Sequence, residues 1–372
     1  MRAQFIVIEQ ALELAVQGRL APPPNPAVGC VITSSAGTVL GQGHTQLAGG
    51  PHAEIMALRD AQAKGNAVVG TTAYVTLEPC SHYGRTGPCC DALIAAGIKR
   101  VVASIADPNP LVSGQGFARL RAAGVEVEVG PGADESRELN IGFFSRMVRK
   151  TPWVRMKIAA SLDGKTALEN GTSQWITGEA ARTDGHAWRA RSCAVLTGIG
   201  TVLEDNPRLD VRLVVTPRQP HLVVVDSRLE TPLDALLFAP QRKLYIYAAQ
   251  PNEEKKVELE KRGATVIYMP GKTDANRSKV DLQAMLLDLA QHDVNELHVE
   301  AGHRLNGSLI REGLVDEFLV YLAPMLIGQG RDMASFGPLA DLASSVPLAF
   351  KSTDRVGKDL RILARITGRD QF

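Results

Sequence analysis

Short apolar β-rich runs alternate with helical runs along the whole of this sequence, and they do so in two separate series. The first series includes the β-rich runs 28–33, 72–77 and 101–103. The second series begins after Thr151, with the β-rich run 153–164. Strands that alternate with helices of this length are typical of an α/β arrangement, in which helices cover the faces of a sheet. The pattern therefore predicts two α/β units, the first of them a three-layer sandwich.

A basic segment with the sequence RMVRKTPW lies between the two series. It overlaps the end of a helix that we expect from Ala133 to about Arg149. The length of 372 residues also exceeds what one hydrophobic core usually serves. Because neither half repeats the other, we expect two unlike domains, 1–150 and 151–372.

The charge balance indicates small-molecule partners. Lys and Arg number 41 and Asp and Glu number 40, so no overall positive field attracts nucleic acid or an anionic membrane. The longest stretch without a charged residue, 20–53, is interrupted by Pro, Gly and Asn and cannot form a spanning helix. The first residues, which include Glu9 and Glu13, do not have the pattern of a signal peptide. We therefore expect no nucleic acid partner, no membrane segment and a cytoplasmic location.

Five cysteines occur in the sequence, and three of them fall within the eleven residues from Cys80 to Cys90. An odd number in a chain without a secretory signal favours a metal site over a disulfide framework. His52, Cys80 and Cys89 form a catalytic zinc set, because three protein ligands leave the fourth tetrahedral position open to water. Zinc-assisted hydrolysis also needs a carboxylate to move protons, and Glu54 is placed for that role.

The other cysteines, Cys30, Cys90 and Cys193, are interpreted as small buried hydrophobic residues. A His-x-Glu triplet on its own is most often a surface pair or a helix cap. The two Pro-Cys pairs, Pro79-Cys80 and Pro88-Cys89, are what make the metal interpretation the stronger one.

His52-Ala53-Glu54 followed by two Pro-Cys pairs resembles the cytidine deaminase superfamily, whose usual second signature is Pro-Cys-x-x-Cys. Here the eight residues 81–88 separate the two cysteines, and this longer loop resembles that of the riboflavin-pathway pyrimidine deaminases. The resemblance implies a cytidine-deaminase-like α/β/α domain, with Asn25 and His44 near the pyrimidine or its ribose phosphate. His82 and Arg85 are further candidates in the loop, as a hydrogen-bond donor and a phosphate ligand.

The second half lacks a complete Gly-x-Gly-x-x-Gly fingerprint, because Leu203 stands where the third glycine would be. The segment ELHVEAGHRLNGSLIREG offers another anion site, at a loop between a strand and a helix. Four segments of the second half, MKIAASLDGK, SQWIT, TVLEDNP and VEAG, resemble the reductase half of the bifunctional riboflavin-pathway enzymes. That reductase half is similar to dihydrofolate reductase. The resemblance covers the chain from about Phe5 to about Ile366.

That resemblance implies NADPH as cofactor and zinc as metal, and it carries over a set of contacts. The implied NADPH contacts are Ala159, Trp175, Thr201, Asp205 and Ser227, together with a loop from Gly302 to Ser308 that comprises Gly302, His303, Arg304, Leu305, Asn306, Gly307 and Ser308. The implied substrate contacts are Ser173, Arg189, Leu209, Arg212 and Glu300. Lys157, Asp205 and Glu300 are ionisable candidates near hydride transfer, of which we take Lys157 and Asp205 as catalytic; the sequence leaves open which group delivers the proton.

The expected function is a bifunctional enzyme of riboflavin biosynthesis. Its first domain would deaminate 2,5-diamino-6-ribosylamino-4(3H)-pyrimidinone 5′-phosphate, and its second would reduce 5-amino-6-(5-phosphoribosylamino)uracil with NADPH. One alternative is a tRNA-type deaminase with an unrelated C-terminal module, against which the net charge and the long cysteine loop argue. Another is a structural zinc module without turnover, against which three ligands and a nearby Glu argue.

We also expect a homo-oligomer, a dimer or a tetramer. The apolar run DEFLVYLAPMLIG suits either an interface between copies or a buried central strand, and the sequence leaves both open.

Overall fold

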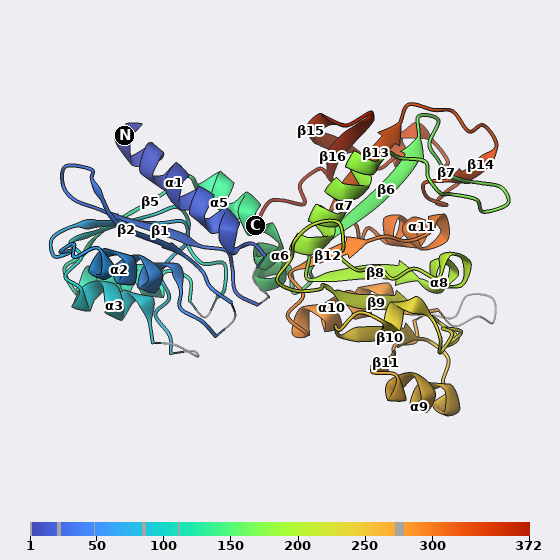
Figure 1. Cartoon of the computed structure of the whole chain (residues 1–372), viewed down its shortest axis with the longest axis horizontal. Helices are drawn as coiled ribbons and strands as arrows, with labels where there is room; N and C mark the ends of the chain where they lie inside the picture. The colour runs from blue at the N-terminus through green and yellow to red at the C-terminus, as the bar shows by residue number, and fades with distance from the viewer. Residues whose placement is uncertain (1, 21–23, 48, 84–86, 111, 272–278) are drawn as a thin grey trace. The chain divides into compact units, whose positions relative to one another are not determined.

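The computed structural model describes residues 2–20, 24–47, 49–83, 87–110, 112–271 and 279–372. The chain forms two compact units (Figure 1), one made of residues 1–150 together with Phe372 and the other of residues 151–371. Within the described ranges, no helix combines the length and the apolar character that a membrane crossing requires.

The first unit is built on a sheet of five strands in the order β2-β1-β3-β4-β5. β1 runs antiparallel to β2 and β3, while β3, β4 and β5 are parallel. The strands are β1 (Gly29–Thr33), β2 (Val39–His44), β3 (Thr72–Val75), β4 (Arg100–Ala103) and β5 (Glu126–Val129). The helices are α1 (Arg2–Gly18), α2 (Ala53–Ala63), α3 (Cys89–Ala95), α4 (Gln115–Ala122), α5 (Ala133–Leu139) and α6 (Ile141–Arg149).

Helices cover both faces of this sheet, with α1 and α5 on one face and α2 and α3 on the other (Figure 1). Successive residues of β3 point to opposite faces, as the pleat of a strand requires. Ala73 and Val75 pack with α2 and α3, whereas Tyr74 packs with Ile8 of α1. The result is the expected three-layer α/β/α sandwich.

Two glycines of β2 allow α2 to lie directly on the sheet. A Cβ at Gly41 would stand 2.3 Å from the carbonyl oxygen of Ala57, and one at Gly43 would stand 2.4 Å from the Cβ of Met56. Any larger residue at either position would push α2 outward. Because α2 begins at the candidate metal site, this close contact fixes the site's distance from the sheet.

The expectation of a single helix from Ala133 to about Arg149 is wrong, because the structure has two helices that meet at Asn140. The buried side chain of Asn140 accepts a hydrogen bond from the backbone N–H of Ala27 at 2.8 Å and donates one to its carbonyl oxygen at 2.9 Å. These two bonds tie the break to the segment that carries Asn25.

The second unit contains a sheet of nine strands in the order β11-β10-β9-β8-β12-β6-β13-β16-β15. The strands from β11 to β13 are parallel, and the β13-β16-β15 end is antiparallel. Its strands are β6 (Trp153–Ser161), β8 (Ala194–Gly198), β9 (His221–Val225), β10 (Leu244–Ala248), β11 (Ala264–Tyr268), β12 (Glu296–Val299), β13 (Glu317–Ala323), β15 (Leu348–Val356) and β16 (Asp359–Ile366). A separate ribbon pairs β7 (Lys165–Leu168) with β14 (Gly330–Asp332).

The helices of this unit are α7 (Glu179–Arg191), α8 (Ile199–Asp205), α9 (Glu253–Lys261), α10 (Leu282–Gln291) and α11 (His303–Arg311), with short 3-10 turns at Leu236–Phe238 and Leu342–Ser344. An apolar core joins α10 and α11 to one face of the sheet. The opposite face of β6, β12 and β13 carries buried charged residues beside an apolar cluster that includes Leu319 and Tyr321. There Arg155, which is 1% exposed, pairs with Glu317 and lies 2.7 Å from Glu296.

Candidate active sites

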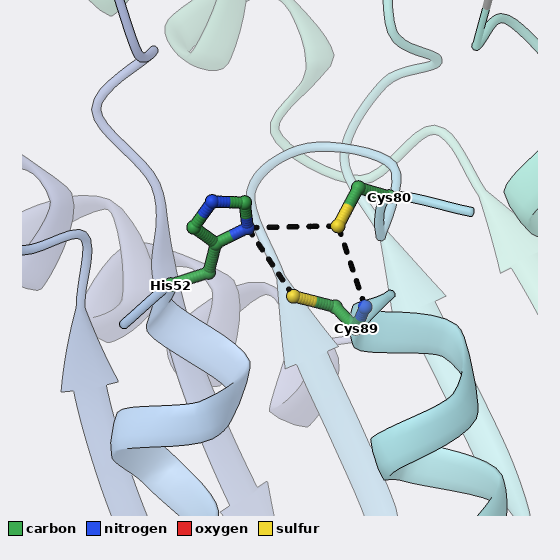
Figure 2. Close-up of side chains that lie close together, drawn as sticks. All are labelled: His52, Cys80 and Cys89. Carbon is green, nitrogen blue, oxygen red and sulfur yellow. Dashed lines mark hydrogen bonds between the residues drawn. The ribbon is translucent and has the colours of Figure 1, made fainter. Parts of the chain in front are cut away.

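The three sequence-predicted zinc ligands come together in the first unit. His52 immediately precedes α2, Cys80 lies in the loop after β3, and Cys89 is the first residue of α3. Figure 2 shows their side chains directed at one another, with His52 Nδ1 3.6 Å from Cys80 Sγ and 3.3 Å from Cys89 Sγ. All three ligand atoms lie within 4.8 Å of one another.

These distances fit a zinc ion. Tetrahedral bonds of about 2.0–2.3 Å from zinc to nitrogen and sulfur place neighbouring ligand atoms roughly 3.4–3.8 Å apart. The donor set of one imidazole and two thiols is also one that zinc prefers, and it leaves a fourth position for a reactant.

Electrostatics prepare Cys80 to be a thiolate. A hydrogen bond from the Cys89 thiol, with smaller effects from His52 and the backbone N–H of Cys89, lowers the pKa of Cys80 to about 4. That backbone N–H, at the start of α3, lies 3.3 Å from Cys80 Sγ. The same thiol–thiolate bond raises the pKa of Cys89, and the bond to Cys80 raises the pKa of His52. The pair therefore holds one negative charge where a cation would sit.

Glu54 lies in the first turn of α2 and lines the same cavity as His52. His52 has an extended backbone (φ −75°, ψ 168°) before the helix, so the two side chains are not set apart by the helical turn. Glu54 is 4% exposed, and burial, with the nearby Cys80 charge, raises its pKa to about 6. A carboxyl group with such a pKa can both accept and release a proton near neutral pH.

The cavity at this site has a volume of about 290 Å³, and Asn25, His52, Glu54, Cys80 and His82 are among its lining residues. His44, at the end of β2, is not among the described residues that line it. Arg85 lies outside the described residues. The cavity could hold a pyrimidine ring, and the predicted role of Asn25 is consistent with its place in the wall.

Sequence reasoning missed five polar residues of this wall, which are Thr45, Glu78, Asp107, Asn109 and Arg146. Asp107 is 9% exposed, and burial raises its pKa to about 6. Apart from Glu78, no short motif marks these residues, because they reach the cavity from distant parts of the chain.

Glu78 has a more specific arrangement. Its buried carboxylate accepts backbone hydrogen bonds from Asp107 at 3.1 Å, Gly114 at 2.9 Å, Gly116 at 2.8 Å and Phe117 at 3.3 Å. Glu78 thereby joins the strand that leads to Cys80 to the segment that carries Asp107 and Asn109. An acidic residue directly before Pro79-Cys80 was the available signal for it.

In the second unit, Glu300 is the centre of a buried ion cluster. Arg189 of α7 donates to Glu300 Oε1 at 2.7 Å and to Oε2 at 3.0 Å, and Lys157 Nζ of β6 lies 3.7 Å from Oε2. Although burial acts to raise it, the charges of Arg189 and Lys157 hold the pKa of Glu300 well below its ordinary value. The structure thus brings together three of the residues that the resemblance implied.

The carboxyl ends of the parallel strands gather several of the implied NADPH contacts. Thr201 of α8 and Gly302 before α11 are neighbours, since a Cβ at Gly302 would stand 3.7 Å from Thr201 Oγ1. Ala159 is in β6 and Ser227 follows β9, whose parallel order places their ends along one edge of the sheet. Ligands of open α/β sheets bind at such an edge.

The other implied contacts are more scattered. Trp175 is 64% exposed, with the Arg182 guanidinium 4.6 Å from its ring centre, and Ser173 precedes it in the same loop. Asp205, the last residue of α8, is exposed, and partial burial of its carboxyl raises its pKa. Leu209 and Arg212 lie in the segment after α8, beside Arg189.

Residues 303–308 were expected to be a loop, and this expectation is wrong because they form the first turns of α11. Asn306 is 3% exposed and donates to the carbonyl oxygen of Met333 at 3.0 Å. A Cβ at Gly307 would stand 1.9 Å from the carbonyl oxygen of Ser335, so this side of α11 packs on the segment 333–335. Leu305 packs against the apolar core of this unit, and Ser308 donates to the carbonyl oxygen of Arg304 within the helix. Gly302, His303 and Arg304 stand at the start of the helix.

Comparisons with known proteins agree with this division of the chain into two sites. Residues 2–105 match the family model for the cytidine and deoxycytidylate deaminase zinc-binding region, and residues 152–362 match the model for the RibD C-terminal domain. The riboflavin biosynthesis protein RibD of Escherichia coli is 42% identical, over 94% of this chain and 96% of that protein. RibD of Aquifex aeolicus is 40% identical, over 95% of each chain.

Solved structures give the same result. A structure of Acinetobacter baumannii RibD matches with a TM-score of 0.88 and 38% identity, over 98% of this chain and 99% of that one. The diaminohydroxyphosphoribosylaminopyrimidine deaminase/5-amino-6-(5-phosphoribosylamino)uracil reductase of Thermotoga maritima matches with a TM-score of 0.85 and 30% identity, over the same shares. These matches confirm the expected fold classes and exclude an unrelated C-terminal module. The chain belongs to the RibD family of bifunctional riboflavin biosynthesis enzymes, which join a deaminase to a reductase.

Proposed function

We propose that the two units catalyse consecutive steps on one substrate. Residues 1–150 deaminate 2,5-diamino-6-ribosylamino-4(3H)-pyrimidinone 5′-phosphate, and residues 151–372 reduce the resulting 5-amino-6-(5-phosphoribosylamino)uracil with NADPH. The observation that carries the proposal is the cluster of His52, Cys80 and Cys89 beside buried Glu54 in one cavity. Membership of the family implies zinc as the cofactor of the deamination and NADPH as the cofactor of the reduction.

His52, Cys80 and Cys89 would hold zinc. When bound, the metal acts as a Lewis acid that makes water nucleophilic at neutral pH. Glu54 takes up a proton at its carboxylate as water adds to C2 of the pyrimidine. It then delivers a proton to the departing amino nitrogen, so that ammonia leaves. Asn25 and Glu78, with Asp107, form the wall that orients the ring.

In the reductase unit, bound NADPH would supply the hydride that reduces carbon C1′ of the ring-opened imine and so completes the ribityl chain. Glu300 and Arg189 hold each other in place on the sheet face that also carries Lys157. Lys157 Nζ is the better placed of the two candidate proton donors, because it contacts Glu300 inside the cluster, whereas Asp205 is exposed at the end of α8. The proton would go to the nitrogen of the ring-opened imine, as hydride adds to its carbon C1′.

The partners are small molecules, and we also propose that a second copy of the chain packs against β15. This strand is the edge of the nine-stranded sheet, and Phe350 on it is 75% exposed and Leu348 45% exposed. Unpaired edges with apolar side chains are usually covered in solution. A mass measurement by light scattering should show a homo-oligomer that Phe350→Asp weakens. We place the enzyme in the cytoplasm, where its cofactor is made available.

The experiment that tests the deaminase assignment is Glu54→Ala in the full chain. Ammonia release should fall below detection, because the substitution removes the carboxyl that moves the proton beside His52. Zinc content and NADPH oxidation with 5-amino-6-(5-phosphoribosylamino)uracil should stay at the wild-type level. Ammonia release that survives in this variant would refute the role of Glu54.

A further inference from the structure

The backbone of the segment Arg208–Arg212 is held by four side chains, which come from three other parts of the reductase unit. Arg242 donates to the carbonyl oxygens of Arg208 and Leu209, and Arg189 donates to that of Asp210. Each of the five residues in the segment has at least one such bond. A loop tied at every residue is rigid before any ligand arrives.

The last two residues of the segment are held by an amide and an imidazole. Gln219 accepts from the backbone N–H of Val211 at 2.7 Å and donates to its carbonyl oxygen at 2.9 Å. His186 Nδ1 accepts from the backbone N–H of Arg212 at 3.2 Å. Burial, with the charges of Arg189 and Arg212, lowers the pKa of His186 to about 4, so its ring is neutral and Nδ1 is an acceptor at pH 7.

This tethering supports a backbone shape that the segment would not adopt alone. Leu209 has a φ of +49°, a left-handed conformation that costs a branched side chain roughly 1 kcal/mol or more. Strained conformations of this kind persist where surrounding contacts over-determine them, and they concentrate at functional sites.

The segment presents two guanidinium groups on one carboxylate. Arg208 Nε lies 2.8 Å from Asp210 Oδ2, and Arg212 Nη1 lies 2.7 Å from Asp210 Oδ1. The Asp210 side chain is 7% exposed, whereas those of Arg208 and Arg212 are 46% and 51% exposed. Asp210 therefore aligns the pair from below, and other N–H groups of both arginines remain accessible to a ligand.

A single side chain, that of Arg189, links this segment to the candidate reductase site. Arg189 reaches Asp210 with Nη1 and Glu300 with Nε and Nη2. A sugar phosphate whose reacting carbon lies near Glu300 would thus meet two exposed guanidinium groups at its phosphate end. Forked guanidinium donors match the oxygens of a phosphate, and the two arginines with Asp210 leave one net positive charge to attract it.

We propose that Arg208 binds the phosphate of the reductase substrate beside Arg212, which the family resemblance already implies as a substrate contact, and that Arg242, Gln219 and His186 are positioning residues that hold the pair in register. This inference rests on the proposed reductase function. It adds Arg208 as a substrate residue beside Arg212, and it gives the neutral imidazole of His186 a role through the backbone of Arg212.

The first test is Arg208→Gln in the full chain, assayed for NADPH oxidation with 5-amino-6-(5-phosphoribosylamino)uracil. The KM should rise about tenfold or more, while kcat changes by less than about threefold, because the lost contact binds the phosphate and not the reacting carbon. Inhibition by ribose 5-phosphate should weaken by a similar factor. Arg137→Gln, which removes a guanidinium from an exposed ion pair with Asp134 in the other unit, is the matched control.

The second test separates positioning from general damage at His186. His186→Leu removes the acceptor for the Arg212 N–H, whereas His186→Asn places an amide oxygen near the position of Nδ1. The KM should rise about tenfold in the Leu variant and return to within about threefold of wild type in the Asn variant. NADPH binding, followed by fluorescence, and ammonia release should be unchanged in both. If His186→Leu does not fold, Gln219→Ala tests the same claim from the other side of the segment.

The outcomes are distinct. A wild-type chain that does not oxidise NADPH with this compound would refute the proposed function. A wild-type chain that does, with Arg208→Gln within twofold of its KM, would refute the phosphate pair alone. Equal damage from His186→Leu and His186→Asn would refute the positioning role.

Discussion

The two candidate sites of this chain are assembled in different ways. The deaminase ligands stand at the starts of helices and just after a strand, and short motifs place each of them. The reductase site is a set of ion pairs between residues far apart in sequence, such as Arg189 and Glu300, which are separated by 111 positions. The difference teaches that substituting a ligand in the first site removes one chemical group. Substituting a residue of the ion cluster in the second site also leaves its ion-pair partners without a partner.

The largest effect should come from the metal ligands. Cys89→Ser replaces a soft thiolate by a hydroxyl, which zinc binds poorly. We expect zinc content to fall well below one ion per chain and deamination to fall more than ~100-fold. NADPH oxidation with the aminouracil substrate should stay within about twofold of wild type, because the reductase unit has its own core. A parallel loss of both activities would break the comparison.

Glu300→Gln should impair reduction and leave deamination intact, the reverse of the result expected for Cys89→Ser. The substitution keeps the size of the side chain but leaves the Arg189 and Lys157 charges without their shared partner. Breaking a buried ion pair on one side costs roughly 3–5 kcal/mol. We expect reduction to fall about 100-fold and the second unit to unfold at lower urea, with ammonia release unchanged. Full reductase activity in a stable Glu300→Gln chain would contradict the role of the cluster.

Glu78→Gln sharpens the comparison, because it tests a tether inside the deaminase site. An amide offers one oxygen to four backbone N–H groups that now share a carboxylate. The KM for the diaminopyrimidine should rise about tenfold, as the segment with Asp107 and Asn109 loosens. Zinc content should be retained, and its loss would show that Glu78 supports the ligands instead of the wall. Glu126→Gln, at an exposed position on β5, is a suitable control.

The smallest effect is a pH dependence of stability. The pKa of His186 is lowered by burial to about 4 from an ordinary value of 6.5. Between these values the unfolded chain binds a proton at this histidine and the folded chain does not, so stability falls as pH drops from about 6.5 to about 4. The slope from one such group is at most about 1.4 kcal/mol per pH unit. Urea unfolding of wild type and His186→Asn should differ in slope within this window, and identical slopes would refute the assignment.

The sequence predicted best where chemistry and spacing coincide within a short motif. His52, Glu54, Cys80 and Cys89 were identified that way, and the structure brings them together. The α/β class also followed from alternating apolar runs, because burial on both faces of a sheet imposes that pattern.

What could not be predicted depends on contacts between distant segments. The helix break at Asn140 depends on Ala27, 113 positions earlier, and the wall residue Asp107 is placed by Glu78, 29 positions away. The helical start of residues 303–308 depends on packing of Gly307 against Ser335. None of these partners has a spacing that one sequence can show.

The molar ratio of ammonia released to NADPH oxidised, with the purified chain and the diaminopyrimidine ribose phosphate, tests the central claim most directly. Two sites that act in sequence on one substrate predict a ratio of one to one at completion. Ammonia without NADPH oxidation would contradict the reductase assignment, and the absence of both would contradict the substrate itself.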